Sequence, residues 1–126
     1  MPLRERLPAE PQSVPRLRGA IEEFAADNGA SDSQRAAIAL AVSEAVSNAV
    51  VHAYVDRDVP GTVAVEANVH EHLLEVVVCD EGVGMRPRLD SPGLGIGLGM
   101  IARLSEKLEL SERSPGVCVR MTFAIG

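Results

Sequence analysis

The sequence predicts a two-layer α+β sandwich, with a mixed, mainly antiparallel sheet and helices on one of its faces. Two segments in the first half space their apolar residues as helices do, and several later segments alternate apolar and polar residues as strands do. A sheet with one apolar face is stable when helices cover that face. The chain has 126 residues, so we expect one core and a single domain over residues 1–126.

The chain begins with a predicted edge strand and a predicted helix. Residues 3–8 fit a short strand that Pro8 ends, because proline cannot donate to a sheet ladder. Residues 13–29 follow with helical spacing, Ser13 as the expected N-cap and an Asn-Gly pair at the end.

A second, longer helix is expected from Ser31 or Asp32 to about Tyr54. Its start carries a capping residue, and the stretch that follows contains neither glycine nor proline. The helix is apolar nearly all the way round, which predicts packing on several sides.

The second half predicts strands around a glycine-rich stretch. Residues 62–70 and 73–80 alternate as two antiparallel strands with a short polar turn between them. After the glycines we expect a helix at about 97–107, a strand at about 108–113 and a closing strand over 116–125.

Composition argues against a protein that binds nucleic acid. The net charge is −6, which removes the usual electrostatic attraction to DNA or RNA. One Tyr, two Phe and no Trp also leave few rings on which bases could stack. Proteins, or an anion whose charge is offset locally, are the expected partners.

The cysteines and the N-terminus predict the compartment. Cys79 and Cys118 lie in apolar runs without CxxC spacing, so we interpret them as buried free thiols, with metal ligands as the alternative. Free thiols are consistent with a reducing cytoplasm. The N-terminal segment has no apolar stretch of a signal peptide, and no run reaches transmembrane length. We therefore expect a soluble, cytoplasmic protein without membrane contact.

Three stretches carry residues that the fold alone does not explain, and the first is in the second helix. Glu44 and Asn48 lie four residues apart on one stripe, with His52 further round. A carboxylate and an amide inside a small domain are costly unless something pairs with them. They either cap backbone groups or line a solvent seam, or they face a ligand. We interpret His52 as a structural hydrogen-bonding residue.

The second stretch is the D-x-G-x-G pattern at residues 80–84. Asp80 ends a buried strand, where its carboxylate can accept a hydrogen bond from a ligand's amino group. Gly82 and Gly84 permit unusual backbone conformations and let the backbone approach a ligand closely. The alternative is a tight turn with Asp80 as a local turn former.

The third stretch is a run of alternating glycines, Gly93, Gly95, Gly97 and Gly99, before an apolar helix. Backbone N–H groups at a helix start can hold an anion, which the helix dipole also favours. A Rossmann fingerprint does not fit, because these glycines come late and after a proline-containing loop. A Walker A loop lacks its GK[ST]. A flexible loop without a ligand is the alternative.

In this order and spacing, the three stretches resemble the GHKL ATP-binding superfamily. A helix with E-x-x-x-N-A-x-x-H precedes two strands that end in D-x-G-x-G, and a short lid and a G-x-G-x-G helix start follow. That superfamily includes gyrase-type ATPases, a heat-shock chaperone, histidine-kinase catalytic domains and mismatch-repair ATPases. "SEAVSNAVVHAY" and the small size are most similar to bacterial anti-sigma-factor serine kinases, over about residues 5–124. The resemblance implies the Bergerat fold.

The same resemblance implies a site for ATP and Mg²⁺. It makes Asn48 the ligand of the Mg²⁺ that bridges the phosphates, and Glu44 the general base toward the attacking hydroxyl. Asp80 would accept a hydrogen bond from the adenine amino group. The glycines would line the pocket, Gly82 and Gly84 beside the adenine and Gly93, Gly95, Gly97 and Gly99 beside the phosphates.

The implied activity is phosphorylation of serine or threonine on a STAS-domain anti-anti-sigma protein, by a homodimer that also binds a sigma factor. A non-catalytic ATP-binding or partner-binding module of the same fold is the alternative. It is favoured by the short lid between Gly84 and Gly93, and by Val117, which stands where relatives often carry threonine. Arg86 and Arg88 in the lid either contact phosphate or a partner, or are solvated.

Overall fold

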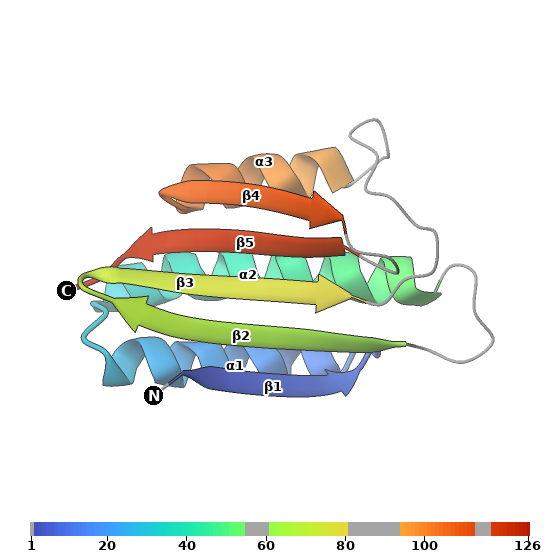
Figure 1. Ribbon diagram of the computed structural model, residues 1–126, viewed down its shortest axis with the longest axis horizontal. Coiled ribbons are helices and arrows are strands. Elements are labelled where there is room, and N and C mark those ends of the chain that lie inside the picture. Colours follow the sequence, from blue (N-terminus) through green and yellow to red (C-terminus); the bar gives the residue numbers. More distant parts are fainter. Residues whose placement is uncertain (1, 55–60, 81–93, 113–116) are drawn as a thin grey trace.

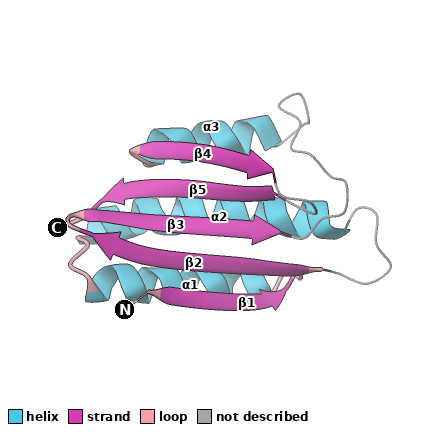
Figure 2. Cartoon of the chain, in the orientation of Figure 1, coloured by secondary structure: helices cyan, strands magenta, loops and turns pink. Residues whose placement is uncertain are grey.

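The computed structural model describes residues 2–54, 61–80, 94–112 and 117–126, which form two layers (Figure 1). A five-stranded sheet in the order β1-β2-β3-β5-β4 makes one layer, and three helices lie on one face of it (Figure 2). The predicted fold class is confirmed, although all four described strand pairings are antiparallel and none is parallel. The elements are β1 (Leu3–Pro8), α1 (Ser13–Asp27), α2 (Asp32–Tyr54), β2 (Thr62–His70), β3 (Leu73–Asp80), α3 (Leu94–Leu104), β4 (Lys107–Glu112) and β5 (Val117–Ala124).

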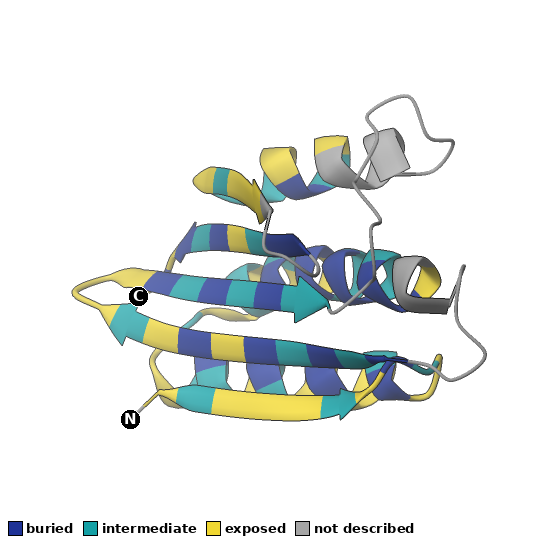
Figure 3. Cartoon of the chain, turned by 45° about the vertical axis from the view of Figure 1, so that its right-hand side comes forward, coloured by how far each residue is buried: buried dark blue, intermediate teal, exposed yellow. Residues whose placement is uncertain are grey.

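Side chains along the strands alternate between buried and more exposed positions, so one face of the sheet is buried and the other is more exposed (Figure 3). In β2, Val63, Val65 and Ala67 are buried. Glu66, which lies between Val65 and Ala67 in the sequence, is exposed. The strand register pairs Val65 with Val78 of β3, which is also buried. Side chains two residues apart share a face of a strand, so these residues form the floor of the core that the helices cover.

The predicted helix α1 is confirmed, but its start differs from the expectation. Leu17 and Ile21 are fully buried, as the helical spacing predicted. Ser13 is not the N-cap, because that position belongs to Gln12 and has no side-chain capping bond. Ser13 is instead buried in the first turn, where its hydroxyl donates to the carbonyl oxygen of Pro8 at 2.7 Å. The serine therefore joins the helix to the end of β1.

The predicted start of α2 is confirmed by a capping box. The backbone N–H of Gln34 donates to Ser31 Oγ at 3.2 Å, and the backbone N–H of Ser31 donates to Gln34 Oε1 at 2.8 Å. The backbone N–H of Gly126 also donates to Gln34 Oε1, which fixes the chain's last residue against this helix start. Although α2 has 23 residues, no helix within the described ranges is long and apolar enough to cross a membrane.

Cys79 and Cys118 are joined by a disulfide, so the interpretation of them as free thiols was wrong. The register of β3 and β5 places them directly opposite each other, with their Cα atoms 4.1 Å apart. Short-range spacing does not reveal this pair, because the two residues are 39 positions apart and only strand pairing brings them together. Their pairing also removes the alternative of metal ligation.

Candidate functional site

Several of the predicted site residues lie in elements that converge at one end of the molecule. The end of β3, the C-terminal half of α2 and the start of α3 lie at the right of Figure 1. The β2–β3 turn and the two chain termini lie towards the opposite end. The fold thus brings together the strand end of Asp80, the helix of Glu44 and Asn48, and the glycine-rich helix.

Glu44 and Asn48 are half-buried on α2. Within the described part of the chain, neither side chain has a hydrogen bond or an ion pair. They therefore do not cap neighbouring backbone groups, which was one of the two structural alternatives. None of the described residues occupies their side-chain oxygen atoms.

Apolar side chains beside Glu44 are more exposed than Glu44 itself, although apolar residues are usually the more buried ones. Leu40 is 50% exposed and Val51 is 60% exposed. At 3.6 residues per turn, these two residues and Glu44 fall within about 40° of one another around the helix axis. We expected α2 to be packed on several sides, and it does contact the sheet, α1 and α3. Among the described residues, however, nothing covers this stripe.

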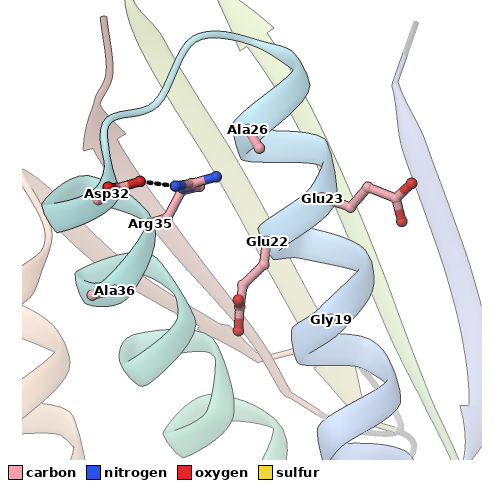
Figure 4. Close-up of a pocket in the computed structure, with 7 residues that line it drawn as sticks. All are labelled: Gly19, Glu22, Glu23, Ala26, Asp32, Arg35 and Ala36. Atoms are coloured by element: carbon pink, nitrogen blue, oxygen red, sulfur yellow. Dashed lines mark hydrogen bonds and ion pairs between the residues drawn. The ribbon is translucent and has the colours of Figure 1, made fainter.

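The stripe's polar residues lie on the side of α2 that faces away from α1. A pocket of about 580 Å³ marks the α1 side, and the Asp32–Arg35 ion pair lies within it (Figure 4). Glu44 and Asn48 are about 80° and 120° further round the helix than Ala36, which lines that pocket. Because α2 lies between α1 and α3, this is the flank toward α3 (Figure 1). The pocket is lined by Gly19, Glu22, Glu23, Ala26, Asp32, Arg35 and Ala36, none of which is a predicted site residue.

Asp80 is the last residue of β3 and is half-buried. Its partner in the register is Val63, a core residue, so its side chain is on the face that the helices cover. Asp80 therefore points into the same layer as Glu44 and Asn48. The remaining loop residues of the predicted site, Gly82, Gly84, Arg86, Arg88 and Gly93, lie outside the described residues, as does the side chain of His52.

The helix after the glycines begins earlier than predicted. α3 runs over Leu94–Leu104 rather than about 97–107, so Gly95, Gly97 and Gly99 lie within it and not before it. Glycine has poor helix propensity, and packing of α3 against α2 overrides it here. The first four N–H groups of a helix have no partner within it, so the backbone groups that could hold an anion begin near Leu94. Gly99 is one turn further in and exposed, and a Cβ added there would meet no atom of the described residues within 4 Å.

The amino-acid sequence is similar to that of known proteins. The histidine kinase-like ATPase domain family matches residues 7–123. The anti-sigma F factor of Caldanaerobacter subterraneus subsp. tengcongensis is 32% identical, with 86% of this chain and 83% of that protein covered. The serine-protein kinase RsbW of Bacillus velezensis is 33% identical, with 93% and 81% covered.

Solved structures agree with the fold. The RsbU and RsbW domains of a Mycobacterium tuberculosis protein superpose with a TM-score of 0.77 at 24% identity, over 99% of this chain and 32% of that one. The histidine kinase domain of a blue-light activated kinase from Erythrobacter litoralis gives 0.61 at 24% identity, over 94% and 62%. This chain thus spans about a third of the Mycobacterium tuberculosis chain and most of each curated relative. By sequence and fold together, the chain belongs to the family of histidine kinase-like ATPase domains.

Proposed function

We propose that this chain is an ATP- and Mg²⁺-dependent serine/threonine kinase. It phosphorylates a STAS-domain antagonist, binds a sigma factor and works as a homodimer. Relatives named serine-protein kinase RsbW and anti-sigma F factor support this proposal at 32–33% identity. The observation that carries it is the half-buried pair Glu44 and Asn48, which has no partner among the described residues.

The available side chains fit a magnesium nucleotide. Mg²⁺ takes oxygen ligands, usually few of them from protein and the others from phosphates and water. The Asn48 amide oxygen, on the flank of α2 that faces α3, would be such a ligand. Bound Mg²⁺ would offset the charge of the phosphates, and bound ATP would supply the phosphoryl group. Asp80, on the same side of the sheet, would accept a hydrogen bond from the adenine amino group.

Glu44 would be the general base. It lies one helical turn before Asn48, so a hydroxyl that reaches the terminal phosphate would also be near its carboxylate. The serine or threonine oxygen bonds to the γ-phosphorus while the bond from that phosphorus to the bridging oxygen breaks. ADP leaves, and the hydroxyl proton passes to Glu44.

A second candidate is a partner-binding module that transfers no phosphate. Val117, at the start of β5, is only 7% exposed. The alternation of β5 puts it on the helix-covered face, together with Asp80. A valine there cannot offer the hydroxyl that the resemblance implies beside the adenine, which favours weaker nucleotide binding.

Labelled phosphate transfer to STAS proteins encoded nearby in the same genome tests the proposal. Glu44→Ala should slow transfer by about 10² to 10⁴-fold, because a positioned base contributes that much, while ATP affinity stays close to that of the wild type. Glu23→Ala is the matched control, since Glu23 is an exposed carboxylate on α1. It should keep the wild-type rate.

Three outcomes would count against the proposal, either against the role of Glu44, against phosphate transfer or against ATP binding. Transfer at the wild-type rate in Glu44→Ala would refute the role of base. ATP binding without transfer to any of the STAS proteins would favour the non-catalytic module. No ATP binding at millimolar concentration in a calorimetric titration would also favour that module, acting through its partner alone.

A further inference from the structure

The disulfide lies at the end of a strand ladder. The register of β3 and β5 runs from Leu73 opposite Ala124 to Cys79 opposite Cys118. The cysteine pair is therefore the last described pair at the end of the sheet where the predicted nucleotide site lies. The ends of a ladder open more readily than its middle, so this is where a covalent link restrains the strands most.

The sulfur atoms lie on the sheet face that carries no helices. Val76 and Val78 of β3 face the core. Successive side chains of a strand point to opposite faces, so the side chain of Cys79, next to Val78, lies on the face away from the core. In the cross-strand row that contains the disulfide, the flanking residues are Ala64 of β2 and Ser111 of β4, both small. Cys79 is half-buried whereas Cys118 is 3% exposed. A small thiol would therefore reach the disulfide at the Cys79 sulfur.

The disulfide and the predicted adenine contact are adjacent in sequence and on opposite faces. Asp80 directly follows Cys79 and points toward the helix layer. The link between Cys79 and Cys118 closes a loop with a sequence separation of 39, and that loop contains Asp80 and the whole of α3. Glu44 and Asn48 lie outside the loop, on α2. The redox state thus restrains one half of the predicted site relative to the other.

We propose that Cys79 and Cys118 form a thiol-reversible clamp that controls nucleotide affinity, an inference that rests on the proposed function. A dithiol reductant opens it: one thiolate attacks the Cys79 sulfur, the S–S bond breaks, and Cys118 leaves as the thiolate and takes up a proton. The second thiol of the reductant then displaces Cys79. Two protein thiols and one oxidised reductant result. A small-molecule disulfide closes the clamp by the reverse exchange.

The closed clamp binds the nucleotide more tightly than the open pair does. With the disulfide intact, the last pair of the ladder stays formed and Asp80 keeps its place on the helix-covered face. With two thiols, this pair can open, and binding must then restore the order that the clamp had provided. Preorganisation of this kind increases affinity because less conformational freedom is lost on binding.

Calorimetric titration of the full chain with Mg-ATP, before and after reduction and thiol alkylation, tests the proposal. Thiol counting should give no free thiols before reduction and two after it. Reduction should lower the melting temperature by on the order of 10 °C, the size expected for a disulfide that closes a loop of this length. The reduced form should bind ATP about five-fold more weakly, at the low end of typical coupling between two sites. The double variant Cys79→Ser/Cys118→Ser should bind like the reduced form and should not respond to reductant.

Thermodynamic linkage provides a second measurement that needs no variant. If oxidation tightens ATP binding five-fold, saturating ATP must favour disulfide formation in a glutathione redox buffer by about the same factor. A disulfide that only stabilises the fold would show no such dependence on ATP. Equal ATP affinities of the two forms, or tighter binding by the reduced form, would overturn the clamp and leave the proposed function intact. Absence of ATP binding in both forms would overturn the clamp together with the ATP dependence of the proposed function.

Discussion

Helices α1 and α2 cover the same sheet, yet their residues are distributed differently. In α1, Leu17 and Ile21 are buried and charged residues such as Glu23 are exposed. In α2, Leu40 and Val51 are exposed while Glu44 and Asn48 are half-buried. Packing against α2 and the sheet accounts for the buried side of α1, but packing leaves one stripe of α2 unexplained.

The difference locates function within the fold. Single exposed apolar residues are common and need no explanation. A polar pair with no partner in the described part of the chain, on the same side of a helix as two exposed apolar residues, departs from the pattern in several ways at once. Natural proteins depart from consistent patterning mainly at functional sites. The stripe of α2 that contains Leu40, Glu44, Asn48 and Val51 is therefore where a ligand or partner is expected.

The largest expected effect is a difference in protein stability between a substitution in α1 and one in α2. Ile21→Ala should lower the free energy of unfolding by about 2 to 5 kcal/mol, because it removes a fully buried side chain and leaves a cavity. Leu40→Ala should cost less than about 1 kcal/mol, since half of that side chain is already in solvent. Urea unfolding monitored by circular dichroism measures both. A large loss for Leu40→Ala would show that this stripe is buried in the protein in solution, for example against a second copy.

A smaller effect on ATP binding is expected from a comparison of two asparagines, Asn28 at the end of α1 and Asn48 in the C-terminal half of α2. Asn48→Ala should weaken Mg²⁺-dependent ATP binding by about ten-fold to a hundred-fold, the loss typical of groups that support a bound metal. Asn28→Ala is the control: Asn28 ends α1 and its side-chain N–H donates to the carbonyl oxygen of Phe24 at 2.8 Å. Its loss should change stability slightly and ATP affinity not at all. Titrations with and without EDTA measure the difference, and equal affinities of the two variants would remove Asn48 from the metal site.

The sequence predicted those features that depend on nearby residues. The spacing of Leu17 and Ile21, the capping residue of α2 and the β2–β3 hairpin are local patterns, and each of these elements is confirmed. The pairing of Cys79 with Cys118 depends on the register of distant strands, so no local pattern contained it.

The start of α3 was missed for a related reason. Glycine propensity opposes a helix at Gly95 and Gly97, and contact between α3 and α2 overrides it. The positions of Glu44, Asn48 and Asp80 on their elements followed from the sequence. The burial of these side chains did not follow from it, because burial depends on how whole elements pack across the helix layer.

The smallest expected effect comes from a comparison of two helical glycines, one in α1 and one in α3, that both have open space around the position of a Cβ. Gly19 in α1 and Gly99 in α3 are both exposed, and at either position an added Cβ would meet no atom within 4 Å in the described part of the chain. Alanine favours a helix over glycine by up to about 1 kcal/mol, so both Gly19→Ala and Gly99→Ala should stabilise the protein by a similar amount. Thermal unfolding of the two variants without nucleotide measures this.

ATP should then distinguish the two variants. The described residues leave space for a methyl group at Gly99, so a bound molecule could give the glycine there a steric purpose. If phosphates lie against the first turns of α3, Gly99→Ala should bind Mg-ATP several-fold more weakly, while Gly19→Ala should bind like the wild type. The stabilisation by ATP in thermal unfolding would shrink for Gly99→Ala alone, because ligand stabilisation falls as the dissociation constant rises. Equal ATP affinities would restrict the phosphate contacts to the first turn of α3 and the residues before it. In that case Gly99 would be a glycine that costs stability without serving the site.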